Sequence, residues 1–341
     1  MHKGLFATTL LLLITSSVFA QRVHTTNVNK DKEHPRAAFS FVHLTDIHVG
    51  EHIDDYGTPG YYGDTMPAGD VGYAAERLRN AVNWINKNAH KRNIKFAIVT
   101  GDLTDSGEKS EFDKVNEILS TLTVPFIPQI GNHDVVSHNA TDRAPTALGD
   151  SLCNLTFHAE FDTLRKWADK WDDGYRLTKV YSPYSRHEQY FQNFKFAYQG
   201  YEFVFCDLNP RFIYGRPKTD HGPNPRLNDF PNASFEWLTK SLAAQPDSTQ
   251  HNVIICTHQP PHHDFMSIFN GLPTPEYNKL TQTLLPYRSH LALWLAGHVH
   301  RFKAYTVHTL HGHKAVIKAR ETGSNKEHRT GKLRVVNVYS R

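Results

Sequence analysis

The stretch KFAIVTGDLTD, residues 95–105, decides the fold class because it joins a buried strand to two carboxylates. Its first half is a continuous apolar run, which is typical of a strand buried on both faces of a parallel sheet. Gly101 then precedes Asp102, and a residue without Cβ permits a sharp turn at a strand end. The stretch therefore predicts a strand over 95–103 that presents polar side chains at its carboxyl end.

Strands and helices alternate on both sides of this stretch. Expected strands cover 39–47, 124–130, 201–208, 251–257 and 291–296, and expected helices cover 71–89, 108–122, 234–244 and 277–285. Three shorter strands follow without a helix between them, at 302–309, 314–320 and 332–339. An aromatic-rich insertion at about 138–200 has one expected helix, around 161–170. The order strand, helix, strand, helix, strand at the start predicts an α/β fold with a largely parallel sheet.

Composition limits the classes of function. The chain has 341 residues, 39% of them hydrophobic, which suffices for one large domain over residues 38–341. Its net charge is only +4, so no strong field favours a nucleic-acid partner. The chain holds 23 histidines and 3 cysteines, so a metal site would be built from nitrogen and oxygen ligands.

The N-terminus is typical of a protein that is exported. Residues 1–20 combine a basic start, an apolar stretch and a small-residue finish, as in a cleavable signal peptide. An uncleaved anchor is the alternative, but the polar interruptions leave the apolar stretch short of the about 20 residues that span a bilayer. Residues 21–37 are expected to be a flexible leader. The mature protein is thus expected to be secreted or periplasmic, with no membrane span.

Five strand ends carry side chains that bind metals. They read TDIH at 45–48, TGDLTD at 100–105, IGNHD at 130–134, TH at 257–258 and AGHVH at 296–300. On an extended backbone, residues two apart point to the same side, so Asp46 with His48, and His298 with His300, could each bind at one site. Because ligands bind beyond the carboxyl ends of parallel strands, these blocks are expected to meet.

These blocks resemble, in order and without substitution, those of the calcineurin-like metallophosphoesterases: D-x-H, GD, GNH followed by D or E, a lone H, and GH-x-H. The resemblance implies a four-layer α/β/β/α sandwich, with the tail strands in the second sheet. It also implies two divalent or mixed-valence metal ions (Zn, Mn or Fe). One ion would be held by Asp46, His48, Asp102 and His300, and the other by Asn132, His258, His298 and the shared Asp102.

The resemblance further implies hydrolysis by a metal-bridging hydroxide that attacks phosphorus, since metals lower the pKa of bound water to about 7. His133 would face the leaving-group oxygen. Asp105 is expected either to orient His133 or to cap the following helix, and Asp134 either to support the site or to form a turn. Histidines outside the blocks, such as His43, are expected to be structural, and His262 and His263 to face solvent.

The expected function is that of an exported phosphoric ester hydrolase acting on a small-molecule phosphate ester. Purple acid phosphatases place a tyrosine ligand where this chain has Asp105, and Ser106-Gly107 stands where protein phosphatases have Arg-Gly. These absences, with Asp134, favour a phosphodiesterase. The alternatives are a phosphomonoesterase of the acid phosphatase or nucleotidase type, a nuclease with a basic groove, and a non-catalytic secreted binding protein on this fold.

Overall fold

The computed structural model describes residues 23–27, 37–51, 73–135, 149–183, 187–210, 224–244, 252–263, 271–326 and 332–339. The expected signal peptide over 1–20 lies outside these ranges. In the part of the chain that the structure describes, no helix combines the length and apolar character that a membrane crossing requires.

The first sheet has five strands in the order β1-β14-β2-β3-β4. Their bounds are β1 Val23–Asn27, β2 Ala37–Leu44, β3 Ile94–Thr100, β4 Phe126–Gln129 and β14 Arg334–Tyr339. β2, β3 and β4 are parallel neighbours, as the alternation of strands and helices predicts. β14 runs antiparallel to β2 and to β1. The three parallel strands therefore end at the same edge of the sheet.

The second sheet has seven strands in the order β12-β13-β11-β10-β9-β8-β5. Their bounds are β5 Lys170–Asp172, β8 Phe194–Tyr198, β9 Tyr201–Phe205, β10 Val253–Cys256, β11 Leu291–Ala296, β12 Lys303–His308 and β13 Ala315–Glu321. β9, β10, β11 and β13 are parallel to one another, whereas β12, β8 and β5 run antiparallel to their neighbours. A separate hairpin joins β6 Lys179–Ser182 to β7 His187–Tyr190.

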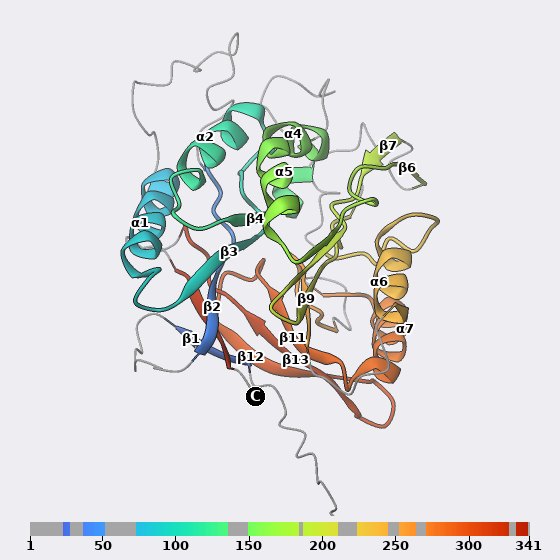
Figure 1. Ribbon diagram of the computed structural model, residues 1–341. Helices are drawn as coiled ribbons and strands as arrows, with labels where there is room; N and C mark the ends of the chain where they lie inside the picture. The colour runs from blue at the N-terminus through green and yellow to red at the C-terminus, as the bar shows by residue number, and fades with distance from the viewer. Residues whose placement is uncertain are drawn as a thin grey trace, which may run out of the picture.

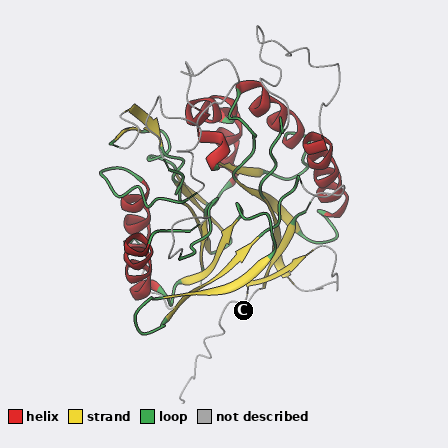
Figure 2. Ribbon diagram, turned by 180° about the vertical axis from the view of Figure 1, so that it is seen from behind, coloured by secondary structure: helices red, strands yellow, loops and turns green. Residues whose placement is uncertain are grey.

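Helices complete a four-layer α/β/β/α sandwich (Figures 1 and 2). On the side of the first sheet lie α1 Tyr73–Asn88, α2 Lys109–Leu119, α3 Asn132–Val135, α4 Gly149–Thr156 and α5 His158–Trp167. The second sheet is covered by α6 Ser234–Ala243 and α7 Thr274–Leu284, with the 3-10 turn Leu285–Tyr287. The buried side chains of α1 recur three and four residues apart, at Ala75, Leu78, Val82 and Ile85, because that spacing faces one side of a helix.

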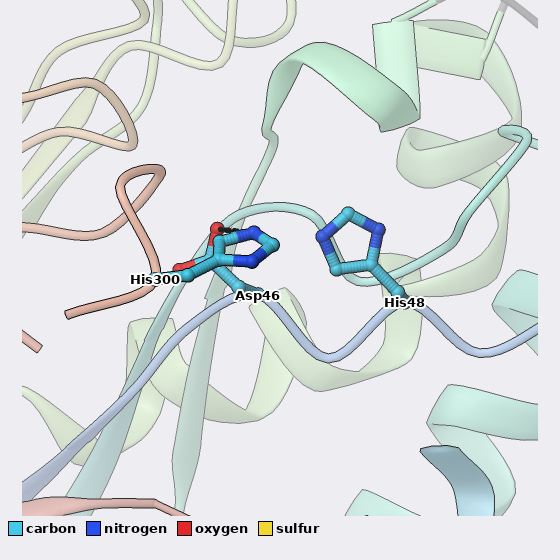
Figure 3. Close-up of side chains that lie close together, drawn as sticks. All are labelled: Asp46, His48 and His300. Atoms are coloured by element: carbon cyan, nitrogen blue, oxygen red, sulfur yellow. Dashed lines mark ion pairs between the residues drawn. The ribbon is translucent and has the colours of Figure 1, made fainter. Parts of the chain in front are cut away.

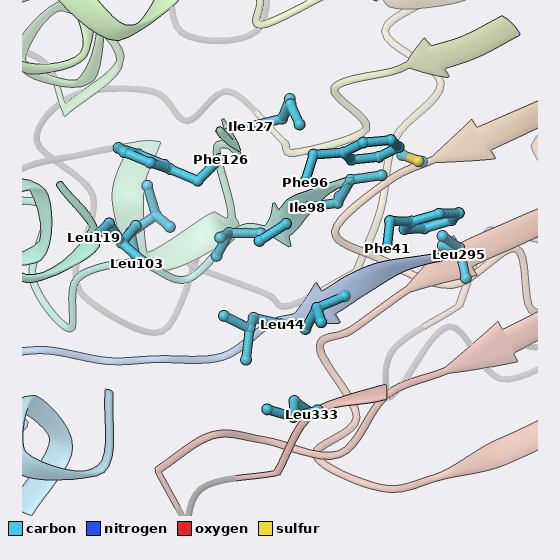
Figure 4. Close-up of a cluster of buried hydrophobic side chains, with 14 of the residues drawn as sticks. Phe41, Leu44, Phe96, Ile98, Leu103, Leu119, Phe126, Ile127, Leu295 and Leu333 are labelled. Atoms are coloured by element: carbon cyan, nitrogen blue, oxygen red, sulfur yellow. The ribbon is translucent and has the colours of Figure 1, made fainter. Parts of the chain in front are cut away.

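The largest hydrophobic core fills the space between the two sheets and extends under α1 and α2 (Figure 4). Phe41 of β2 and Phe96 of β3 stack with ring centroids 5.0 Å apart, and both meet Phe203 of β9 edge-on. A second cluster joins the outer face of β10 and β11 to α6 and α7. The first cluster packs the two sheets together, and the second packs α6 and α7 on the outer face of the second sheet.

Two expectations about the chain ends are corrected by the sheet order. β14 was expected in the second sheet but lies in the first, between β1 and β2. Its burial is continuous over Arg334–Val338, as suits a central strand, whereas the β12–β13 hairpin keeps exposed positions. Within the expected leader, β1 is a strand that pairs with β14 at the edge of the first sheet.

The insertion holds more structure than its sequence predicts. The expected helix is present as α5, but α4 and strands β5 to β8 were not predicted. β5 is only three residues long, and its Trp171 stacks on Phe194 and Phe196 of β8. Tertiary aromatic contacts of this kind form strands that carry no periodicity in the sequence.

Candidate metal centre

All seven residues that were expected to bind metal lie just beyond the carboxyl ends of parallel strands. Asp46 and His48 follow β2, Asp102 follows β3, Asn132 follows β4, His258 follows β10, and His298 and His300 follow β11. The first three strands belong to one sheet and the last two to the other. The site therefore sits where the same edges of both sheets meet, as strand order predicts.

Asp46, His48 and His300 form the first group, in which one possible ligand atom of each lies within 4.8 Å of the others (Figure 3). The Nε2 atom of His300 is 3.4 Å from Oδ1 of Asp46. Asp46 and His48 are buried, whereas 28% of the His300 side chain is exposed. The first group is therefore open to solvent on the side of His300.

Asp102, His258 and His298 form the second group. The amide oxygen Oδ1 of Asn132 lies 3.0 Å from Nε2 of His258, which places Asn132 in the same group. Oδ2 of Asp102 is 3.1 Å from Nε2 of His258 and 3.5 Å from Nε2 of His48. The Asp102 carboxylate thus stands between the two groups, in the position that a shared ligand requires.

The backbone of the ligand residues differs from the extended conformation that their spacing suggested. Asp46, His48, Asp102, His298 and His300 all have positive φ angles, between 47° and 71°. Five of the ten non-glycine residues with positive φ in the described ranges are therefore expected ligands. This left-handed conformation costs about 1–3 kcal/mol per residue, and the surrounding packing has to hold it. The pairs converge through turned backbone, not through strand alternation.

Two glycines make this crowding possible. A Cβ on Gly297, directly before His298, would lie 1.8 Å from Oγ1 of Thr45. A Cβ on Gly131, directly before Asn132, would lie 2.1 Å from the backbone nitrogen of Asp102. Both contacts are with neighbouring blocks of the site, so any side chain here would push two ligand loops apart.

The histidine tautomers suit metal binding. Nδ1 of His258 lies 2.7 Å from the carbonyl oxygen of Thr100, and a carbonyl only accepts, so Nδ1 carries the proton and donates it. Nδ1 of His48 lies 3.0 Å from the carboxylate of Asp105. In both rings Nε2 is then the nitrogen left to bind a metal, and a metal ion would take the place of any proton on it. Nε2 of His48 is buried with no hydrogen-bond partner in the described residues. These donors, with two carboxylates, fit divalent cations.

The site carries a negative field that favours cations. Burial acts to raise the pKa of Asp102, but the surrounding histidines, His258 foremost, outweigh it and hold the pKa well below its usual range. Burial also acts to raise the pKa of Asp46, and its hydrogen bond with His300 brings that pKa down. Burial lowers the pKa of His258, yet the carboxylates of Asp102 and Asp46 raise it to about 9. Two buried carboxylates therefore stay ionised in the site and favour positive charge beside them.

Asp105 contacts a ligand histidine and does not cap a helix. Its carboxylate accepts from His48 Nδ1, while the nearest distance from that carboxylate to His133 Nδ1 is 3.8 Å. The N-cap of α2 is Glu108, in a reciprocal capping box with Glu111. His133 Nδ1 instead donates to the backbone carbonyl of Asp105, over 2.7 Å. The capping alternative is wrong, and Asp105 holds His133 through its backbone.

His133 lies on the solvent-exposed side of the site. Its side chain is 41% exposed, and its backbone N–H donates to Oδ1 of Asp102 over 2.9 Å. Burial lowers the pKa of His133, but the Asp102 carboxylate and the Asp105 carbonyl raise it, and the net shift is upward. With Nδ1 bound to a carbonyl, Nε2 is the nitrogen available to a substrate.

Asp134 connects two ligand loops. Its carboxylate accepts from the backbone N–H groups of Gly131, Leu103 and Thr104, at 2.7, 3.1 and 2.8 Å, and from the Thr104 hydroxyl. Burial and the nearby Asp102 raise the pKa of Asp134 to about 6. Asp134 is thus both a turn residue and a support for the site.

Among the other histidines, His43 is structural as expected, whereas the solvent position expected for His262 is wrong. The ring nitrogens of His43 lie 2.7 Å from the hydroxyls of Thr100 and Thr322, in the core. His262 was expected in solvent, but its Nε2 lies 2.5 Å from the fully buried carboxylate of Glu321, and its ring stacks on Tyr305. A buried carboxylate needs a partner, which sequence spacing does not reveal.

The segment after β13, residues 322–326, was not singled out in the sequence, yet it hydrogen-bonds to the backbone that carries Asp46. The Ser324 hydroxyl donates to the carbonyl of Asp46 over 3.0 Å, and the Asn325 N–H donates to the carbonyl of Thr45. Lys326 pairs with Glu51 at 2.7 Å. The only signal was the turn composition of Thr322-Gly-Ser-Asn325 after a strand, which does not identify its partner.

Two sequence comparisons with known proteins give matches. The sequence model of the calcineurin-like phosphoesterase family matches residues 39–302. A probable cyclic nucleotide phosphodiesterase of Rhodopseudomonas palustris is 45% identical over 60 residues, which are 18% of this chain and 21% of that protein.

Solved structures with a similar arrangement include a purple acid phosphatase from yellow lupin seeds and a 5'-nucleotidase from Candida albicans. Their TM-scores are 0.43 and 0.39, with sequence identities of 12% and 16%. The matches cover 84% and 87% of this chain but 44% and 48% of the other two chains. The chain thus spans about a fifth of the curated relative and less than half of these structures.

Proposed function

Because the chain belongs to the calcineurin-like phosphoesterase family and is by that class a phosphoric ester hydrolase, we propose that it is a metal-dependent phosphodiesterase acting on a small-molecule phosphate ester. The observation that carries the proposal is the convergence of two groups of ligand-type side chains on one shared carboxylate, Asp102. A two-metal arrangement suits in-line displacement at phosphorus.

The residues present fit two divalent cations. Asp46, His48, Asp102 and His300 would hold one ion, and Asp102, Asn132, His258 and His298 would hold the other. Bound there, the ions would supply a water of lowered pKa as nucleophile and would neutralise the phosphoryl oxygens. The neutral imidazoles leave a net positive charge after two carboxylates are counted, which is what an anionic ester requires.

Three side chains outside the ligand set would assist. Asp105 fixes the ring of His48 by accepting from Nδ1, so Nε2 keeps its direction. The carbonyl of Asp105 fixes His133 in the same way, and Nε2 of this half-exposed side chain would donate a proton to the leaving oxygen. Asp134 holds the loops that carry Asp102 and Asn132 at a constant separation.

Preference for a diester is supported by the short match to a probable cyclic nucleotide phosphodiesterase and by Asp105 standing where purple acid phosphatases have a tyrosine ligand. The test is a rate comparison. After loading with Mn²⁺, Zn²⁺ or Fe²⁺, the protein should cleave an aromatic phosphodiester faster than the matching monoester. Faster cleavage of the monoester would establish the phosphomonoesterase alternative instead.

A second measurement distinguishes the proposed enzyme from a non-catalytic binding protein on this fold. We expect the Asn132→Ala and His258→Ala variants to lose most diester hydrolysis, because each removes one ligand of the second group. Asn116→Ala, in an exposed part of α2, is the matched control and should keep full activity. Hydrolysis unaffected by both ligand variants would contradict the two-metal mechanism.

We also propose export, on the strength of the N-terminal sequence alone. Residues 1–20 would be removed before Gln21, which leaves the mature domain outside the cytoplasm. Mass spectrometry of the N-terminus in the exported fraction should find chains that begin at Gln21. Recovery of intact Met1 in the cytoplasmic fraction would refute this.

A further inference from the structure

A network of buried polar side chains, Asp207, Asn209 and Gln259, adjoins the loops of the second group at the end of β9. Asp207, Asn209 and Gln259 are each fully buried, although none was singled out in the sequence and none is an expected ligand. Asp207 and Asn209 follow β9, and Gln259 follows β10. Hydrogen bonds join the three side chains to one another, which gives the network a defined arrangement, and only Oε1 of Gln259 has no partner in the described residues.

The side chain of Asn209 connects two ligand loops. Its Nδ2 donates to the carbonyl of Ile130 over 3.0 Å, and Ile130 lies two residues before Asn132. Its Oδ1 accepts from Nε2 of Gln259 over 2.7 Å, and Gln259 directly follows His258. One amide group thus touches the loop of Asn132 and the loop of His258 at the same time.

Asp207 fixes the orientation of that amide. Oδ1 of Asp207 accepts from the backbone N–H of Asn209 over 3.0 Å and from its Nδ2 over 2.8 Å. A carboxylate oxygen cannot donate, so Nδ2 must face Asp207, and Oδ1 of Asn209 must face Gln259. Oδ2 of Asp207 accepts from the backbone of Gln192, which anchors the arrangement in the insertion.

We propose that Asn209 is a positioning residue that sets the separation of Asn132 and His258, and thereby the affinity of the second group for its metal ion. The proposal rests on the ligand sets of the proposed function. The first group has independent supports, since Asp105 fixes His48 and Ser324 fixes Asp46. Loss of Asn209 should therefore weaken one of two metal sites and leave the other.

The experiment is a titration of the metal-free full chain with Mn²⁺, followed by calorimetry and by electron paramagnetic resonance. In Asn209→Ala we expect one of two Mn²⁺ ions to bind about 10- to 100-fold more weakly, the usual effect of removing a group that orients ligands. With one equivalent of Mn²⁺ per chain, the electron paramagnetic resonance spectrum should be that of a single Mn²⁺ ion without a second ion beside it. The ion that weakens should be the one that His258→Ala weakens further, because both changes affect the second group. His300→Ala, which changes the first group, should weaken the other ion.

The matched control is Asn337→Ala. Asn337 is also a buried amide that accepts one side-chain hydrogen bond, from Ser40 over 2.8 Å, but it lies toward the opposite ends of the parallel strands. It should bind both ions as the wild type does. Gln259→Met is the second variant, because it keeps the side-chain length and removes the amide whose Nε2 donates to Asn209, while the lost Oε1 has no partner in the described residues; it should weaken the same ion.

Equal weakening of both ions, or wild-type binding of both in Asn209→Ala and Gln259→Met, would overturn the proposal. So would failure of both variants to fold while Asn337→Ala folds, since the network would then serve stability alone. Because Mn²⁺ binding is read without any ester, its outcome is separate from hydrolysis. A chain that binds two ions and cleaves no ester would refute the proposed function and leave this inference standing.

Discussion

At the scale of residues, the site depends on the side chains that orient the ligands as well as on the ligands themselves. Asp105, Asp134 and Ser324 each bond to a ligand or to its loop. The seven ligand-type residues could be predicted from the sequence, because short blocks at strand ends report the type and order of the side chains. Their left-handed backbone could not, since Asp and His are common elsewhere with negative φ.

Asp105 gives a prediction at this scale. Asp105→Ala removes the acceptor of His48 Nδ1, so the ring can turn, and we expect binding of one metal ion to weaken about 10- to 100-fold. Asp105→Asn keeps an acceptor oxygen and should lose less. Asp113→Ala, an exposed carboxylate on α2 that pairs with Lys109, is the control. Calorimetric metal titration checks this; a change in unfolding free energy without any change in metal affinity would contradict it.

Gly297 gives a second prediction. A Cβ there would overlap Thr45 and approach Asp46, so Gly297→Ala should force the His298 loop away from β2. We expect a loss of about 1–3 kcal/mol in the free energy of unfolding, together with weaker metal binding. Gly174→Ala is the control, because its Cβ would meet only one atom, at 3.9 Å. Urea unfolding of both variants measures the difference, and equal stability of Gly297→Ala and wild type would count against the crowding described.

At the scale of elements, helices and strands with a regular apolar pattern can be predicted from the sequence, whereas helix capping and strand pairing are harder to predict. The periodicity of α1 and the apolar runs of β2 and β3 predicted those elements, because one buried face imposes a spacing. The cap of α2 was not predicted, since Asp105 was the candidate cap and the observed cap is Glu108. The sheet to which β14 belongs could not be predicted, because strand pairing depends on tertiary contacts that the sequence pattern does not report.

The capping box of α2 predicts a pH dependence of stability. Burial, then the charge of Glu108, raises the pKa of Glu111 well above its usual value in the folded protein. A folded-state pKa above the unfolded value means that the folded protein binds the proton more tightly. The stabilisation is then full below the unfolded pKa and is lost as pH rises through the folded pKa.

Glu111→Gln should remove that dependence. We expect the unfolding free energy of the wild type to fall relative to that of the variant as pH rises above about 4.5, the usual glutamate value. Urea unfolding at a series of pH values checks the slope. Glu76→Gln on α1 is a control with the same chemical change. A constant difference between Glu111→Gln and wild type at every pH would show that Glu111 keeps an ordinary pKa.

At the scale of the whole molecule, two sheets bring together blocks that are far apart in the chain. Asp46 and His298 are 252 residues apart, and the backbone N–H of His298 donates to both carboxylate oxygens of Asp46 at 3.0 Å. The layered α/β fold and the gathering of strand ends could be predicted from the sequence. The cross-links that hold the edge, such as Asn209 with Gln259 and His262 with Glu321, could not, because single polar residues in loops carry no periodicity.

The claim that one shared carboxylate joins two metal sites has a direct structural test. The full chain, loaded with Mn²⁺ or Zn²⁺, should be crystallised and its anomalous scattering recorded at the metal edge. We expect two peaks, one among Asp46, His48, Asp102 and His300, and one among Asp102, Asn132, His258 and His298. A single peak, or a second peak that does not touch Asp102, would contradict the binuclear site on which the proposed chemistry depends.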